Sequence, residues 1–147
     1  MTRRAQATES GAGRPALGSN FLVDFGDGKA HDSSGGFAEV IFPEFRIGAG
    51  GEGPSAPSFP GNTLLLRRGI SGTLDLYAWW DKARRGRATR GKSLKIMLLG
   101  QDQRTVVLTW TFHKIRPVAL SYSPLRAQES QVAMETIELA FDGFEVS

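Results

Sequence analysis

The sequence predicts a mainly β fold with one α-helix, in which an antiparallel barrel or sandwich carries the helix. Segments of alternating apolar and polar residues recur along the chain, as in strands with one buried face. Glycine and proline cluster between these segments, as in turns. Only residues 74–85 combine helical spacing of apolar side chains with start and stop signals for a helix.

Three strands are predicted before the helix. The first begins at Asn20 and alternates to residue 25, and the second covers residues 37–45. Pro43 weakens the end of the second strand, because proline cannot donate a hydrogen bond to a ladder. The third strand covers residues 63–68 and ends at Gly69.

The predicted helix, residues 74–85, has signals at both ends. Ser71 or Thr73 can cap its first turn, Asp75 suits the positive end of the helix dipole, and Gly86 is a good stop. Apolar side chains on one face predict where the helix rests on the sheet. They are Leu76, Trp79, Trp80 and Ala83.

Four strands are predicted after the helix, over residues 93–99, 105–113, 118–122 and 132–141. Pro117 separates the second of these from the third. The 105–113 strand has one polar, uncharged face, as expected of a solvated side or a channel wall. That face carries Thr105, Val107, Thr109 and Thr111.

Two segments are predicted to stand apart from the packed fold. Residues 1–18 are polar and basic, which predicts a flexible tail before a domain over residues 19–147. Residues 46–62 form a loop rich in glycine and proline. A loop of this length is either a mobile surface loop or an arm that orders on a neighbouring subunit.

Charge is unevenly distributed, although the net charge is only +3. Residues 82–95 hold seven basic residues and no acidic one, whereas residues 129–147 hold five acidic residues and no basic one. Copies of such a polarised molecule can dock head to tail. The basic run is read as a protein contact, a solvated surface or, with Tyr77, Trp79 and Trp80 as stacking platforms, a single-strand nucleic-acid site.

Enzymatic chemistry finds no support in the residue pattern. The chain has no cysteine, and its two histidines, His31 and His113, lie far apart without metal-ligand spacing. No nucleophile elbow or phosphate-binding loop is present. We therefore predict no catalytic residue, metal or cofactor. The sequence has neither a secretory signal nor an apolar span, which predicts cytoplasmic assembly without a membrane anchor.

Several short motifs, in their order and spacing, resemble the tail-tube proteins of contractile phages and phage-derived contractile injection systems. The resemblance covers residues 20–146. The motifs are Asn20-Phe21-Leu22-Val23, Gly36-Phe37-Ala38-Glu39-Val40, Leu66-Arg67-Arg68-Gly69-Ile70, Trp79-Trp80, Trp110-Thr111-Phe112, Arg116-Pro117-Val118, and the run from Val132 to Ala140.

The resemblance implies hexameric rings whose sheets join into one β-barrel around a lumen. Such rings stack head to tail into a rigid tube, inside a contractile sheath that drives it through a target envelope. Sheath, baseplate and tube-cap proteins are then the partners, and a payload, with nucleic acid only as cargo, fills the lumen. Phage tail and injection system both remain open, as do the payload, the target, the lumen charge, a second tube paralogue and the role of the N-terminal tail.

Within this resemblance, three groups of residues receive roles. The helix and its basic run face the sheath through Lys82, Arg84, Arg85, Arg87, Arg90 and Lys92. The polar face of the 105–113 strand lines the lumen. Contacts between subunits involve Pro43, Glu44, Arg46, Phe59, Arg67, Arg68, Glu135 and Glu138.

Overall fold

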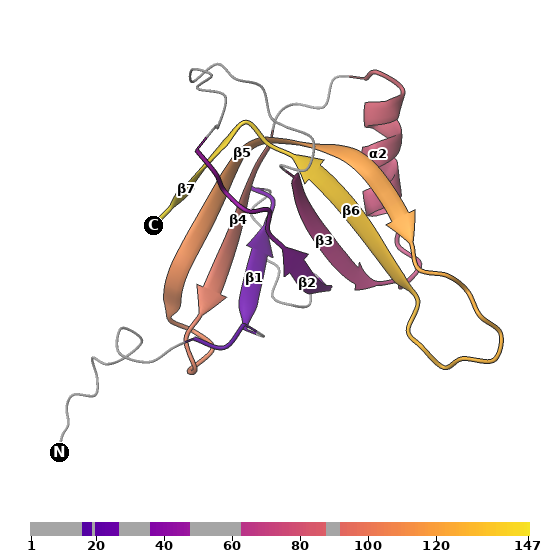
Figure 1. Ribbon diagram of the computed structural model, residues 1–147, viewed down its shortest axis with the longest axis horizontal. Helices are drawn as coiled ribbons and strands as arrows, with labels where there is room; N and C mark the ends of the chain where they lie inside the picture. The colour runs from indigo at the N-terminus through magenta and orange to yellow at the C-terminus, as the bar shows by residue number, and fades with distance from the viewer. Residues whose placement is uncertain (1–15, 19, 27–35, 48–62, 88–91) are drawn as a thin grey trace. The chain divides into compact units, whose positions relative to one another are not determined.

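A computed structural model describes residues 16–18, 20–26, 36–47, 63–87 and 92–147 of the chain. Its described elements are seven strands and the helix α2 (Figure 1). They fall into two compact units. Unit 1 comprises residues 1–36, 93–112 and 144–147, and unit 2 comprises residues 37–92 and 113–143. The long strand β5 (Val106–Tyr122) runs from unit 1 into unit 2.

Unit 1 is built around the first half of β5. Strand β1 (Phe21–Asp24) pairs antiparallel with β4 (Lys92–Leu99), and β7 (Gly143–Val146) pairs with β5. Alternate side chains of these strands point inward and exclude water. The most buried are Val23, Leu94, Ile96 and Phe112, with Phe144 stacked on Phe112 at 5.8 Å between ring centroids.

Unit 2 contains a four-stranded antiparallel sheet. Its strand order is the second half of β5, then β6 (Met134–Ala140), β3 (Thr63–Gly69) and β2 (Phe37–Ile41). Burial alternates along β3 and β6, so one face of the sheet is apolar and covered. The fully buried side chains of that face include Leu64, Leu66, Ile137 and Leu139.

Strand β5 corrects the prediction of two strands separated by Pro117. It continues for 17 residues through the proline, with a register shift between Pro117 and Ala119 against β6. The shift leaves Val118 as an extra residue, which is a β-bulge. Among the described strands of unit 2, only β6 pairs with this half of β5, and a proline is tolerated at an edge or a bulge because no interior ladder needs its missing N–H.

Other strand boundaries also differ from those predicted. Strand β2 ends at Ile41 and not at residue 45, before Pro43. Strand β6 begins at Met134 and not at residue 132. The short strand β7 was missed, because four residues are too few to show an alternating pattern. The predicted tail over residues 1–18 and the loop over residues 46–62 lie almost entirely outside the described residues.

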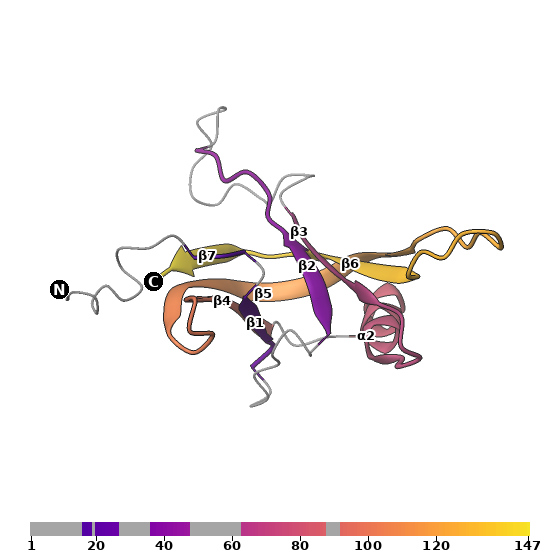
Figure 2. The ribbon, with the colours of Figure 1, turned by 90° about the horizontal axis from the view of Figure 1, so that it is seen from below.

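Helix α2 (Asp75–Arg84) lies on one side of the sheet of unit 2 (Figures 1 and 2). The prediction that Ser71 or Thr73 caps it is wrong: the N-cap residue is Leu74, without a side-chain capping bond. Thr73 is engaged elsewhere, since its hydroxyl contacts Asp75 and the guanidinium of Arg68. At the other end Gly86 follows the helix with φ of 73°, a left-handed conformation that suits a glycine stop.

Candidate assembly surfaces

A buried ion-pair cluster ties the start of α2 to the sheet. Arg68 on β3 donates through Nε to Oε2 of Glu135 on β6 at 2.7 Å, and through Nη1 to Oδ2 of Asp75 on α2 at 3.3 Å. Its Nη2 also pairs with Oδ1 of Asp75. The guanidinium lies over the ring of Phe37, 5.4 Å from its centroid. One side chain therefore joins β2, β3, β6 and the helix.

The cluster stabilises the ionised forms of Asp75 and Arg68. Burial favours the neutral form of Asp75, but the hydrogen bonds and positive charge of Arg68 outweigh it and lower the pKa of that carboxyl. Burial opposes the charge on Arg68 as well, yet Asp75 and Glu135 raise its pKa. Arg68 and Glu135 expose only 9% and 6% of their side chains. As contacts between subunits they stay predictions, and little of their surface is left for a neighbour.

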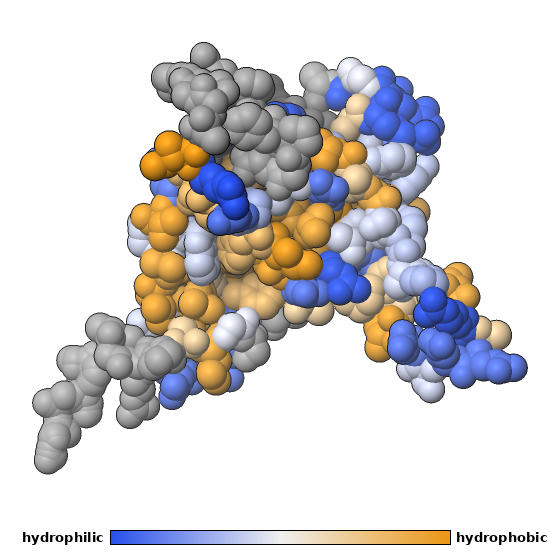
Figure 3. All heavy atoms as spheres, in the orientation of Figure 1, coloured by the Kyte–Doolittle hydropathy of each residue, from blue (hydrophilic) through white to orange (hydrophobic). Residues whose placement is uncertain are grey.

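The basic end of α2 is partly neutralised by a residue that precedes the run. Asp81 accepts from Nε of Arg84 at 2.6 Å and pairs with Nε of Arg85 at 3.0 Å. The hydrogen bond from Arg84, followed by that from Arg85, lowers the pKa of Asp81. Arg84 also lies over the Trp80 ring, 5.1 Å from its centroid. Figure 3 shows hydrophilic residues gathered at this end of the helix.

The remaining residues predicted on or near α2 occupy a range of environments. Leu76 is buried, whereas Trp79, Trp80 and Ala83 are half-buried. Lys82 and Arg87 are exposed, and the ammonium of Lys92 lies 5.4 Å from the Trp79 ring centroid. Arg90 lies outside the described residues. The tryptophans therefore combine packing with cation–π contacts, which the sequence reading did not foresee.

The face of the unit 2 sheet opposite its buried face carries polar, half-exposed side chains. We call this surface the polar sheet face. Its polar members are Glu39, Thr63, Arg67, Arg116, Ser121, Thr136 and Glu138, and the register also places the apolar side chains of Ile41, Leu65, Ala119 and Met134 on it. Arg67 donates to Glu39 at 2.8 Å and to Thr136 Oγ1 at 3.2 Å, and Thr63 donates to Glu138 at 2.6 Å.

The four residues predicted to line the lumen lie in or beside the first half of β5. Thr105 precedes the strand, Val107 is exposed, and Thr109 and Thr111 are half-buried. The hydroxyl of Thr105 donates to Oδ2 of Asp102 at 2.5 Å. The backbone N–H groups of Arg104 and Thr105 donate to Oδ1 of the same carboxylate.

These three hydrogen bonds predict an acid-sensitive turn. The Thr105 side chain, then the two backbone N–H groups, lower the pKa of Asp102 from 3.8 to about 2. A depressed pKa contributes stability above pH 3.8 that is lost as the pH falls towards 2. In urea unfolding, the difference in midpoint between the wild type and Asp102→Asn should shrink from about pH 5 to about pH 2. A constant difference across that range would contradict the assignment.

A hairpin arm of residues 123–133 connects β5 to β6 and extends beyond the sheet of unit 2 (Figure 1). Its neck is closed by Ser123, whose N–H donates to the Met134 carbonyl and whose Oγ accepts from the Met134 N–H, both at 2.9 Å. Leu125 and Val132 are 84% and 71% exposed. The sequence predicted a loop from Ser123 and placed Val132 in the following strand, so the projecting arm was not predicted.

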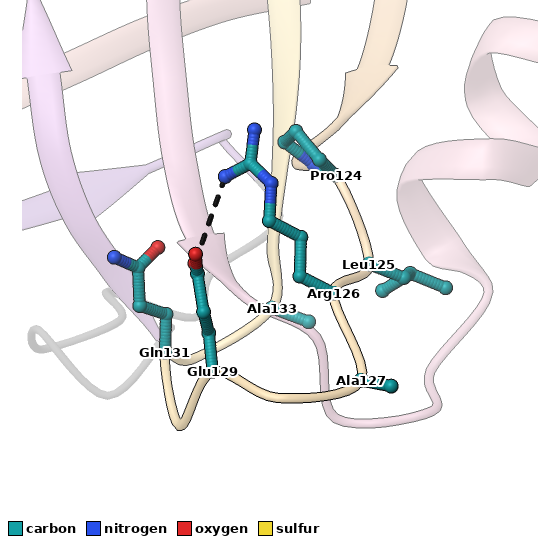
Figure 4. A pocket seen from close by; sticks show the side chains of 7 residues that line it. All are labelled: Pro124, Leu125, Arg126, Ala127, Glu129, Gln131 and Ala133. Atoms are coloured by element: carbon teal, nitrogen blue, oxygen red, sulfur yellow. Dashed lines mark ion pairs between the residues drawn. The ribbon is translucent and has the colours of Figure 1, made fainter.

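The arm borders an open pocket of about 350 Å³ within unit 2 (Figure 4). Arg126 Nη1 and Glu129 Oε1 form an ion pair there at 3.6 Å, and the side chain of Leu125 points away from that pair. The lining residues are Pro124, Leu125, Arg126, Ala127, Glu129, Gln131 and Ala133. Because Arg126 and Glu129 pair with each other, the arm carries no net charge, and Leu125 and Val132 are exposed apolar side chains on it.

The other residues predicted at subunit contacts are dispersed. Glu44 and Arg46 pair with each other at 2.9 Å and are largely exposed, and Pro43 is half-buried. Phe59 lies outside the described residues. These positions stay predictions. Within the described part of the chain, no group of three or more His, Cys, Asp or Glu residues could hold a metal ion. No described helix has the length and apolar character to span a membrane.

Comparison with known proteins decides the family. Residues 19–145 match the family model of the T4-like virus tail tube protein gp19. The chain belongs to the T4-like virus tail tube protein family. This tail tube protein is a structural subunit of the tube of a phage tail or phage-tail-like particle, as the sequence motifs predicted, and the nucleic-acid-binding alternative has no support. Among curated proteins, none matches the sequence.

Solved structures share the fold. One match is a chain of the extracellular contractile injection system PVC sheath-tube complex in the extended state, with TM-score 0.72, 20% identity, and coverage of 98% of this chain and 99% of that one. A chain of the anti-feeding prophage (AFP) baseplate has TM-score 0.63, 25% identity, and coverage of 91% and 96%. Hcp1 from Flavobacterium johnsoniae has TM-score 0.55, 13% identity, and coverage of 86% and 94%. The predicted mainly β fold with one helix is confirmed.

Proposed function

We propose that this tube subunit forms hexameric rings that stack head to tail into a hollow tube. A contractile sheath surrounds the tube, a baseplate and a cap close its ends, and a payload passes through its lumen. Support comes from the structural matches, which include chains of a sheath-tube complex, a baseplate and a tube-terminating cap. The role is mechanical and requires no catalytic step by the subunit.

The observation that carries the ring proposal is the pair of edges of the unit 2 sheet. Within the described part of unit 2, the sheet ends at β2 on one side and at the second half of β5 on the other. Four antiparallel strands place these two edges in opposite directions. Joining β2 of one copy to β5 of the next would therefore continue the antiparallel order and satisfy the free backbone groups of both edges.

Both edges carry a β-bulge, and this favours selective pairing. Ala38 is the extra residue of β2, between Phe37 and Glu39, and Val118 is the extra residue of β5. Bulges disturb an edge so that arbitrary strands pair with it poorly. A head-to-tail ring of identical subunits would bring these two bulged edges together.

The helix would face outward, because a sheet-lined lumen leaves it no room. Its exposed basic end is then a candidate contact for an acidic sheath surface. The Trp80 ring and Asp81 hold Arg84 in place, which reduces the entropy lost when a partner binds it. Lys82 and Arg87 add exposed positive charge nearby. Residues 1–18 as a tail and residues 46–62 as an arm complete the proposed organisation around a tube domain over residues 19–147.

Negative-stain electron microscopy of the purified protein tests the proposal. Rings or hollow rods of one constant diameter are expected. As an internal test, Arg84→Gln with Arg85→Gln should leave these rods unchanged and weaken only attachment of the sheath, because both residues lie on the outward helix. A protein that stays monomeric at high concentration, or rods lost in this double variant, would contradict the assignment of the edges or of the helix.

The hairpin arm yields a separate prediction. Leu125→Ser should raise the protein concentration needed for rods to form, because a copy of this chain is the commonest neighbour in a tube and the exposed leucine offers it apolar surface. The unfolding midpoint should stay within error, since an 84% exposed side chain contributes little to the folded subunit. Sedimentation assays across a concentration series measure the first effect. Ala127→Ser serves as the matched control on the same arm.

A further inference from the structure

We propose that the polar sheet face lines the lumen, and that Glu39 masks the charge of Arg67 so that the wall does not hold polyanions. The proposal rests on the proposed tube, and assigns its inner surface. The unit 2 sheet has two faces: one is apolar and buried and receives α2, and the other is half-exposed and polar. If the edges join into a closed wall, only the second face is free to meet water and cargo.

The charges of this face are bound within it. Arg67 on β3 carries a guanidinium at the middle of the polar sheet face, and its side chain is 35% exposed. Glu39, directly opposite it in the register of β2 and β3, binds Nη1 at 2.8 Å, while Thr136 on β6 binds Nε at 3.2 Å. Glu138 accepts from the Thr63 hydroxyl at 2.6 Å. Arg116 lies on the same face, opposite Ala140, and pairs with Asp142 at 2.9 Å. In the part of this face that the structure describes, each arginine is therefore engaged by a carboxylate.

Pairing of the arginines weakens the binding of polyanionic cargo to the wall. Phosphate groups bind proteins through lysine and arginine, and the released counterions drive the affinity. A repeated ring of free arginines would grip a nucleic acid at every subunit. A ring in which each arginine is paired with a neighbouring carboxylate offers no such grip, so a polyanion can slide past. The inferred wall is therefore one that conducts polyanionic cargo without retaining it.

The proposal differs from the expectation that Thr105, Val107, Thr109 and Thr111 line the lumen. Those residues belong to unit 1, whereas the polar sheet face belongs entirely to unit 2. The joined edges also belong to unit 2. A continuous wall made by joining those edges presents the polar sheet face along its whole circumference, which the first half of β5 cannot do.

Single cysteines can locate the inner surface, because the natural chain has none. Ser121→Cys reports the polar sheet face, Ala78→Cys the helix, and Val107→Cys the rival surface; all three parent residues are exposed. Preassembled rods are treated with a small maleimide or with a maleimide on a polymer too wide for the bore. We expect Ser121→Cys to react with the small reagent only, and Ala78→Cys with both.

Glu39→Gln then tests the masking role. Rods assembled with a fluorescent single-stranded oligonucleotide should retain about tenfold more nuclease-protected probe than wild-type rods, because the positive charge of Arg67 is no longer neutralised. Asp81→Asn is the matched control, since it frees Arg84 and Arg85 on the helix and should bind only nuclease-sensitive probe. Equal retention by Glu39→Gln and wild-type rods would overturn the masking role.

The outcomes distinguish failure of the proposed tube from failure of the lumen assignment. Absence of rods by microscopy in the wild type would refute the proposed tube. Rods in which Ser121→Cys reacts with the wide polymer as fast as Ala78→Cys would refute only the lumen assignment. Protection of Val107→Cys in place of Ser121→Cys would move the lumen to the first half of β5.

Discussion

Replacing Arg68 with methionine should lower the free energy of unfolding by about 3–5 kcal/mol, the cost of breaking a buried ion pair from one side. The substitution leaves Glu135 with a side chain only 6% exposed and without its 2.7 Å partner. It also removes the link to Asp75 and the contact with the Phe37 ring. Urea unfolding of disassembled subunits measures the loss.

Two variants control this result. Arg68→Met combined with Glu135→Leu should recover most of the lost stability, because a buried pair replaced by apolar side chains is often neutral. Asp75→Asn should cost at most about 1 kcal/mol, since that carboxylate is 63% exposed and solvent screens it. Arg68→Met unfolding at the wild-type urea concentration would show that the cluster does not hold the helix and the sheet together.

The second large effect is expected at the sheet edges. A chain carrying Ala38→Cys on β2 and Val118→Cys on β5 should form a ladder of covalent oligomers with a short bis-maleimide. Each proposed joint places β2 of one subunit beside β5 of the next, so the two thiols lie close together. The bulges leave the exact register of the joint open, and the cross-linker is long enough to connect the two thiols when that register differs by a few residues. Non-reducing conditions are unnecessary, since the thioether bonds survive denaturing electrophoresis.

The single variants distinguish the geometry of the joint. Neither Ala38→Cys nor Val118→Cys alone should give more than monomers, because a head-to-tail ring brings unlike edges together. Dimers from Ala38→Cys alone would mean that β2 meets β2 of its partner. That result would replace the ring with a two-fold dimer, and it would refute the proposed joint even if rods were seen.

Local patterns were sufficient for much of the fold. The third strand was predicted over residues 63–68, and β3 covers Thr63–Gly69. Helix α2 was predicted within one residue at each end, because apolar spacing and Gly86 agree. The motifs spread over residues 20–146 also led to the tail tube family, which the match over residues 19–145 confirms.

The features that the sequence did not predict depend on tertiary contacts. Pro117 reads as a strand break, yet β5 tolerates it where its neighbour in unit 2 lies on one side only. The partner of Arg68 is Glu135, 67 residues away, so no spacing rule could pair them. The pairing of Asp81 with Arg84 was not predicted, because the basic run was taken to begin at Lys82. The residues that share the polar sheet face come from separate strands. They are known only once the register between those strands is known.

A cryo-EM map of the assembled tube, at a resolution that separates strands, tests the central claim most directly. We expect β2 of each subunit to be hydrogen-bonded antiparallel to the second half of β5 of the next, with the polar sheet face inward and α2 outward. Subunits joined through any other element, or α2 lining the bore, would contradict the account.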